Sequence, residues 1–217
     1  ANFTTAMGSA FKADLSKTFS SEQEALDFLN QNIEAQFHID SIEKRPSTKA
    51  PAAPFTTSTL QQEASRKLGF SVSRTMQNAQ RLYEDGLITY MRTDSVNLSK
   101  QALAQAASVI ESNYGKQYLR THQYVTKKKG AQEAHEAIRP TDLTLMEANV
   151  EYDQQRLYDL ILKRTLASQM SLAKLERTVA KIVTDKHPHA FVARGEVVVF
   201  DGFLKLYLEG VDDPSDE

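Results

Sequence analysis

The sequence contains no cysteine, and this absence excludes disulfide bonds and zinc sites with cysteine ligands. It has no apolar run of roughly 20 residues, the length that a membrane-spanning helix needs. Its first residues, Ala1 to Thr5, lack the basic and apolar regions of a signal peptide. The phosphate-binding pattern Gly-x4-Gly-Lys-Ser/Thr is also missing. We therefore expect a cytoplasmic protein that has no membrane partner and no ATP site.

The composition that is present is that of an ordinary globular protein. The 217 residues are 41% hydrophobic and 25% charged, which suits one or two domains. The net charge of −2 conceals an uneven distribution, because residues 61–140 carry 12 Lys and Arg against 7 Asp and Glu. A basic middle between acidic flanks is typical of a module that contacts DNA. Since the chain starts without Met and ends in an acidic run, we expect a piece of a longer protein.

Capping residues and apolar spacing predict five helices, at 22–32, 57–68, 71–85, 100–113 and 152–168. Alternation and turn signals predict strands at 36–43, 87–92, 177–184, 190–194, 196–200 and 203–208. Gly195 and the pair Asp201-Gly202 are the expected turns between the last strands. Residues 45–54 contain three of the six prolines, so we interpret them as a linker.

This order of elements predicts an α+β fold in which a mainly helical domain, 50–171, is inserted into a β-rich domain made of 1–49 and 172–217. Two helices joined by a short glycine-containing turn, followed by a strand, are typical of a winged-helix arrangement. Arg74 and Arg81 on the second helix would then face DNA.

The residues that carry chemistry lie in segment 86–95. If 89–94 is extended, Tyr90, Arg92 and Asp94 share one face, because side chains two apart point the same way. A phenol with a pKa of about 10 needs help to ionise. A nearby guanidinium favours the phenolate and can hold a phosphate oxygen. The pattern suits attack on a phosphodiester, although a half-buried strand tyrosine beside a solvated arginine would show the same spacing.

Two longer motifs carry a resemblance to a known family. Residues 88–95, Ile-Thr-Tyr-Met-Arg-Thr-Asp-Ser, resemble the active-site signature of the type IA DNA topoisomerases. Residues 134–141, Ala-His-Glu-Ala-Ile-Arg-Pro-Thr, are similar to that family's downstream histidine motif, and 54–62 and 79–84 also match. The resemblance covers about residues 50–175. Methionine at position 91 favours the bacterial topoisomerase I branch over the topoisomerase III branch.

The resemblance implies roles for individual residues. Tyr90 would attack the phosphorus and form a 5′-phosphotyrosine link, Arg92 would hold the non-bridging oxygens, and His135 would assist at the same phosphate. The remaining predicted DNA-binding residues are Thr93, Asp94, Arg74, Arg81 and Arg139. Thr93 and Asp94 would mainly position the segment, and Arg139 could instead tie its loop down through Glu133 or Glu136.

The family's fold implies that 50–171 is the tyrosine domain and that 1–49 with 172–217 is the arch domain. The expected partners are DNA, preferably single-stranded, and the remaining domains of the same polypeptide, with a nucleoid-associated location. We expect no cofactor in this chain, no metal site, and Mg²⁺ only in the intact enzyme. The chain alone would then fail to relax negative supercoils.

Two other readings of the sequence stay open. A winged-helix transcription regulator would explain residues 57–92 without any catalysis. A structural arch module that binds a partner protein is a weaker alternative.

Overall fold

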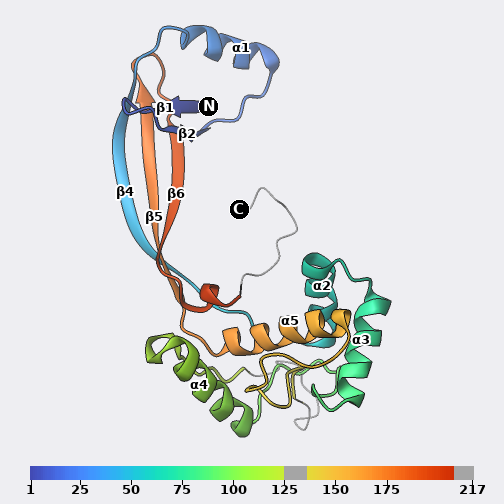
Figure 1. Ribbon diagram of the computed structural model, residues 1–217. Helices are drawn as coiled ribbons and strands as arrows, with labels where there is room; N and C mark the ends of the chain where they lie inside the picture. Colours follow the sequence, from blue (N-terminus) through green and yellow to red (C-terminus); the bar gives the residue numbers. More distant parts are fainter. Residues whose placement is uncertain (125–135, 208–217) are drawn as a thin grey trace. The chain divides into compact units, whose positions relative to one another are not determined.

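The computed structural model describes residues 1–124 and 136–207 and shows a mixed helix-and-strand chain (Figure 1). It divides into two compact units, each built from two stretches of sequence. Unit 1 is Ala1–Thr48 with Lys174–Phe200, and unit 2 is Lys49–Ala173 with Asp201–Glu217. The mixed composition agrees with the α+β prediction.

Unit 1 is built on a four-stranded sheet with the order β3-β6-β5-β4. Its strands are β3 (Asp14–Leu15), β4 (Phe37–Lys49), β5 (Ala173–Thr184) and β6 (Phe191–Phe200). The antiparallel pairing of β5 with β6 places Arg177 opposite Glu196, and the two side chains form an ion pair of 2.7 Å. A separate hairpin consists of β1 (Asn2–Thr4) and β2 (Ala10–Lys12), with Gly8 between them at a φ of 84°.

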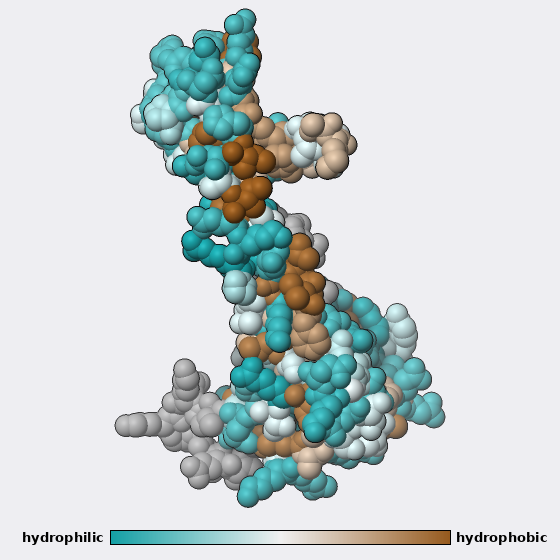
Figure 2. Space-filling view, turned by 90° about the vertical axis from the view of Figure 1, so that its left-hand side faces the viewer, coloured by the Kyte–Doolittle hydropathy of each residue, from teal (hydrophilic) through white to brown (hydrophobic). Residues whose placement is uncertain are grey.

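The core of unit 1 forms at one end of the long strands, where α1 (Glu22–Gln31) packs. Phe28 of this helix lies in a buried cluster with Ala13, Ile182 and Phe191. The predicted cap is confirmed, because the Ser21 hydroxyl accepts the backbone N–H of Glu24. Along the rest of the sheet, apolar side chains stay exposed (Figure 2), among them Ile39, Ile42, Val197 and Val199.

Two predictions for unit 1 were wrong. The linker predicted over 45–54 begins only after Lys49, because β4 continues through Pro46. Proline lacks a donor for the strand ladder but is tolerated on an edge strand, and β4 is the edge of this sheet. Gly195 is not a turn: it lies inside β6 opposite Thr178, so the two strands predicted at 190–200 are one.

Unit 2 is mainly helical, and the predicted helices are confirmed to within a few residues. They are α2 (Thr57–Leu68), α3 (Val72–Glu84), α4 (Lys100–Tyr114) and α5 (Tyr152–Ser168). The helix α5 packs against the other three, and its Leu157, Tyr158 and Ile161 are fully buried (Figure 1). A short 3-10 helix, η1 (Lys116–Tyr118), follows α4.

Residues 201–207 belong to unit 2 and not to the sheet. The strand predicted at 203–208 was wrong, because the chain forms a 3-10 helix, η2 (Gly202–Lys205). The pair Asp201-Gly202 makes no hairpin. A Cβ at position 202 would lie 2.5 Å from the backbone oxygens of Ser171 and Leu172, so the glycine is needed for close docking. Tyr207 completes the docking by donating a 2.7 Å hydrogen bond to the buried Glu63.

The strand predicted at 87–92 was also wrong. Ile88 makes one isolated antiparallel bridge, to Pro140, and the neighbouring residues form bends. The winged-helix detail of the fold prediction is therefore not confirmed. Among the described residues, no helix is both long and apolar enough to span a membrane.

Candidate active site

The segment that carries Tyr90 begins at the end of α3, where the chain reverses. Gly86 has a φ of 72°, and its N–H donates to the oxygen of Tyr83 while the N–H of Leu87 donates to the oxygen of Leu82. These two bonds form a Schellman motif, in which the residue with positive φ is usually glycine. The motif returns the chain along the last turn of α3. The Tyr90 ring consequently meets that of Tyr83 edge to face, with the centroids 5.2 Å apart.

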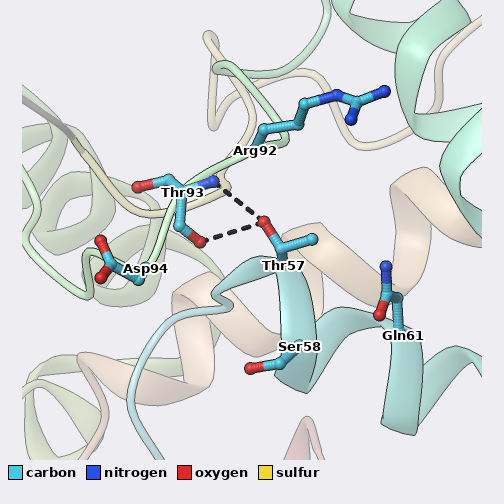
Figure 3. A pocket seen from close by; sticks show the side chains of 6 residues that line it. All are labelled: Thr57, Ser58, Gln61, Arg92, Thr93 and Asp94. Carbon is cyan, nitrogen blue, oxygen red and sulfur yellow. Dashed lines mark hydrogen bonds between the residues drawn. The ribbon is translucent and has the colours of Figure 1, made fainter.

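Burial alternates along the following residues, although they form no strand. Ile88, Met91, Thr93 and Ser95 are buried, whereas Tyr90 is 45% exposed and Arg92 and Asp94 are exposed too. Exposed and buried residues therefore alternate over 91–95. Figure 3 shows, however, that the Arg92 and Asp94 side chains extend in different directions, so they do not share one face as an ideal strand would require.

The first residue of α2 holds this segment in place. The Thr57 hydroxyl donates to the oxygen of Met91 (2.8 Å). It also donates to the oxygen of Thr93 (3.1 Å) and accepts the N–H of Thr93 (2.9 Å), as Figure 3 shows. The N–H of Thr57 also donates to the oxygen of Thr93. The helix start is itself fixed by a capping box between Thr56 and Thr59. The backbone that carries Arg92 is thus attached to a helix terminus.

An open cleft of about 450 Å³ lies between α2 and this segment. It is lined by Thr57, Ser58, Gln61, Arg92, Thr93 and Asp94 (Figure 3). Within residues 1–124 and 136–207, no hydrogen bond or ion pair holds the Arg92 guanidinium, which leaves its donors available to a phosphate. Thr93 is only 8% exposed, and its hydroxyl accepts the N–H of Ser95. Such contacts suit a residue that positions the segment.

The described part of the histidine block, residues 136–141, lies directly beside the tyrosine segment. The N–H of Thr89 donates to the oxygen of Arg139 (2.9 Å), and the N–H of Arg139 donates to the Thr89 hydroxyl (3.0 Å). That hydroxyl donates in turn to the oxygen of Ala137 (2.7 Å). A second threonine, Thr141, donates from its hydroxyl to the oxygen of Gly86 (2.7 Å). The two motifs that carry the family resemblance are therefore joined by a continuous set of hydrogen bonds.

Arg139 lies within its own loop and is not directed to the cleft. Its side chain is 12% exposed and forms a 2.7 Å ion pair with Glu136. Glu136 also accepts the backbone N–H of Ser99. Burial would raise the pKa of the Glu136 carboxyl, but the hydrogen bonds from Arg139 and Ser99 outweigh burial and hold the pKa below its usual value. The interpretation of Arg139 as a loop anchor through Glu136 is confirmed; His135 and Glu133 lie outside the described residues.

Arg74 and Arg81 occupy exposed positions on α3 and are already paired. Arg74 forms a 2.6 Å ion pair with Asp153, and Arg81 forms a 3.1 Å pair with Glu151. These acids belong to the start of α5, so the pairs join α3 to α5. Neither arginine lines the cleft beside Arg92.

Sequence reasoning missed the residues that hold the motifs together, above all Thr57, Thr89 and Thr141. Each lies next to a quoted motif or inside it, but a threonine gives no signal of its long-range partner. In the described part of the chain, no cluster of three or more His, Asp or Glu side chains could hold a metal ion.

Comparisons with known proteins point to one family. A family model described as DNA topoisomerase matches residues 1–217. The DNA topoisomerase 1 of Rickettsia felis is 45% identical over 210 residues, which are 90% of this chain and 27% of that protein. The DNA topoisomerase 1 of Zymomonas mobilis is 50% identical over 183 residues, which are 83% of this chain and 15% of that protein.

Among solved structures, full-length topoisomerase I from Thermotoga maritima matches with a TM-score of 0.72 and 36% identity, covering 94% of this chain and 35% of that one. The chain spans less than a third of the length of the two curated relatives.

Proposed function

The chain belongs to the DNA topoisomerase family, in the branch of topoisomerase I, and we propose that it carries the DNA-cleaving tyrosine of a type IA enzyme. The observation that best supports this role is the junction of the two motifs. Thr89 and Arg139 bring the tyrosine segment and the histidine block together, and Tyr90 and Arg92 emerge from it exposed.

The proposed reaction is the reversible transfer of one DNA phosphodiester to Tyr90. The phenol oxygen attacks the phosphorus, a P–O bond to Tyr90 forms, and the bond to the 3′ oxygen breaks. The phenol loses its proton and the departing 3′ oxygen gains one, so no net proton is consumed. The phosphotyrosine link conserves the phosphodiester for resealing, which is the reverse attack by the 3′ hydroxyl. An ATP site is unnecessary for this chemistry.

We assign Arg92 to the non-bridging oxygens of that phosphate. A planar guanidinium with no described partner can bind two oxygens at once, and it stabilises the charge that builds up during the transfer. His135 is proposed to assist at the same phosphate, and Thr93 and Asp94 to position the segment. Arg74 and Arg81 would contact DNA only by exchanging Asp153 and Glu151 for phosphates, so we propose a smaller contribution from each of them.

The substrate that we propose is single-stranded DNA, as exposed by negative supercoiling, and strand passage through the break would relax it. This places the intact protein in the cytoplasm on the nucleoid. We propose that the intact enzyme holds its Mg²⁺ through residues other than those that the structure describes, and no step above depends on the ion. The chain alone is therefore proposed to bind DNA without relaxing it.

Neither alternative reading accounts for these observations. A transcription regulator would use Arg74 and Arg81 on DNA, yet both are paired with carboxylates, and the histidine block would have no role. The match to the family over residues 1–217 extends far beyond the two helices that suggested the regulator. A structural module would not need an exposed tyrosine beside an arginine that has no partner among the described residues.

Fluorescence anisotropy with labelled oligonucleotides tests the proposed binding. The chain should prefer a single strand over a duplex, with little dependence on sequence. Arg92→Ala should weaken binding and lower the slope of log K against log salt by about 0.7, the value for one phosphate contact to a single strand. Arg81→Ala is the matched control and should change binding less. Tight binding to one duplex sequence, unaffected by Arg92→Ala, would refute the proposal.

Relaxation of a supercoiled plasmid tests the proposal that the chain alone cannot relax DNA. The purified chain with Mg²⁺ should leave the plasmid unchanged. Relaxation that disappears in Tyr90→Phe would show that the chain alone is sufficient.

A further inference from the structure

Buried neighbours fix the backbone around Tyr90, but few contacts among the described residues restrain the Tyr90 side chain. Ile88 and Met91 are each 1% exposed and anchor the chain on both sides of Tyr90. Tyr90 itself is 45% exposed, and no hydrogen bond in residues 1–124 and 136–207 restrains its hydroxyl. A phenol on a fixed backbone still chooses among staggered side-chain rotamers. The position of the oxygen therefore depends on what the ring contacts.

Tyr83 supplies such a contact. Its ring lies 5.2 Å from that of Tyr90 with an interplanar angle of 64°, which is the edge-to-face geometry that aromatic pairs prefer. Tyr83 comes from the last turn of α3, and the Schellman motif at Gly86 sets the separation of the two residues. A helix restricts the rotamers that an aromatic side chain can adopt, so the ring of Tyr83 limits where the ring of Tyr90 can lie.

We propose that Tyr83 is a positioning residue for Tyr90, and that its ring holds the phenol in the rotamer from which the oxygen attacks the phosphorus. This inference rests on the proposed function, because it matters only if Tyr90 is the nucleophile. The ring of Tyr83 acts through its shape and its aromatic edge, and its hydroxyl takes no part.

A positioning role for Tyr83 makes a specific prediction for the rate at which the covalent adduct forms. Effective attack needs the reacting atoms close together and in line, so a ring that samples other rotamers reacts more slowly. DNA binding through Arg92 does not depend on that rotamer. Loss of the Tyr83 ring should lower the rate of the covalent step and leave the affinity for DNA unchanged.

The test compares Tyr83→Ala, Tyr83→Leu and Tyr83→Phe in the complete enzyme that contains this chain. Single-turnover formation of the covalent adduct on a single-stranded oligonucleotide gives the rate, and anisotropy gives the affinity. An edge-to-face pair predicts a fall of about threefold to tenfold in rate for Ala and Leu, with full rescue by Phe. Tyr152→Ala, at an exposed tyrosine at the start of α5, is the matched control and should keep the wild-type rate.

Two outcomes would overturn the inference. If Tyr83→Ala weakens DNA binding at an unchanged single-turnover rate, the ring stacks on a base and does not position Tyr90. If Tyr83→Phe is as slow as Tyr83→Ala, the hydroxyl is what acts. Tyr90→Phe in the same assay separates this inference from the proposed function. A covalent adduct that persists in Tyr90→Phe refutes the proposed function. If Tyr90→Phe forms no adduct but Tyr83→Ala and Tyr83→Leu both keep the wild-type rate, only the positioning role of Tyr83 is refuted.

Discussion

Thr89 and Arg139 lie fifty residues apart in the sequence and are joined by two backbone-linked hydrogen bonds, of 2.9 Å and 3.0 Å. The Thr89 hydroxyl takes part in one of them and also donates to the oxygen of Ala137. The Thr89 side chain therefore connects the tyrosine segment to the histidine block, together with the backbone and the Thr141 hydroxyl. The relative position of these motifs depends in part on it.

Thr89→Val should consequently destabilise the chain. Valine has nearly the same shape but leaves the N–H of Arg139 and the oxygen of Ala137 without this partner. A buried polar group that loses its partner costs about 1–3 kcal/mol, which should appear as a lower free energy of unfolding in urea. Thr89→Ser keeps the hydroxyl and is the control. Equal stability of the Val and Ser variants would show that the hydroxyl is not what joins the motifs.

A second prediction concerns Thr57, which attaches the segment of Arg92 to α2. Thr57→Val removes hydrogen bonds to the backbone of Met91 and Thr93. We expect weaker single-strand binding in the anisotropy assay, because the backbone that directs Arg92 into the cleft is released. Thr57→Ser should restore binding, and Ser58→Ala, one residue further along α2, should have little effect. Undiminished binding by Thr57→Val would mean that Arg92 needs no such support.

Helices were predictable from the sequence because their signals are local. Ser21, Ser71 and Ser99 accept N–H groups at the starts of α1, α3 and α4, as their positions before apolar periodic runs indicated. The conformation of residues 203–208 was not predictable from the sequence, since their short apolar pattern suits a strand as well as a helix. The conformation of the described residues 203–207 is decided by docking of Phe203 onto Ser171 and of Tyr207 onto Glu63.

In the candidate site, too, local features were predictable from the sequence and long-range contacts were not. Tyr90 and Arg92 were recognisable from residues close together in the sequence, but the sequence did not say whether they are exposed. The threonines that hold them, Thr57 and Thr89, act on partners 34 to 50 residues away. No periodicity or spacing in the chain encodes those pairs.

A third prediction follows from the pKa of Glu136. Its pKa in the folded chain lies below the usual value, because hydrogen bonds from Arg139 and Ser99 outweigh burial. The stabilisation is therefore fully present above the unfolded carboxyl pKa of about 4.3, and it is lost as the pH falls through the folded pKa. Thermal unfolding between neutral and acidic pH should show a smaller loss of stability on acidification in Glu136→Gln than in the wild type.

The matched control for that experiment is Glu111→Gln, at an exposed position of α4. It should follow the wild-type acid dependence. If Glu136→Gln does so as well, the ion pair with Arg139 contributes nothing to acid stability.

A fourth prediction concerns Gly86, whose φ of 72° forms the reversal between Tyr83 and Tyr90. A Cβ there would meet no atom within 4 Å, so the cost of Gly86→Ala is backbone strain alone, about 1–2 kcal/mol. Gly195→Ala is the matched control, because that glycine also has open space but no positive φ. Equal unfolding free energies for the two variants would contradict the strained reversal.

The central claim is that Tyr90 becomes linked to DNA, and mass spectrometry of the trapped adduct tests it most directly. The complete enzyme is denatured during cleavage of a single-stranded oligonucleotide and digested with trypsin and nuclease. The tryptic peptide 82–92 contains both Tyr83 and Tyr90, so fragmentation can assign the modified residue. The account predicts a 5′-phosphonucleotide on Tyr90 and none on Tyr83. An adduct on Tyr83 or on any peptide other than 82–92 would contradict it.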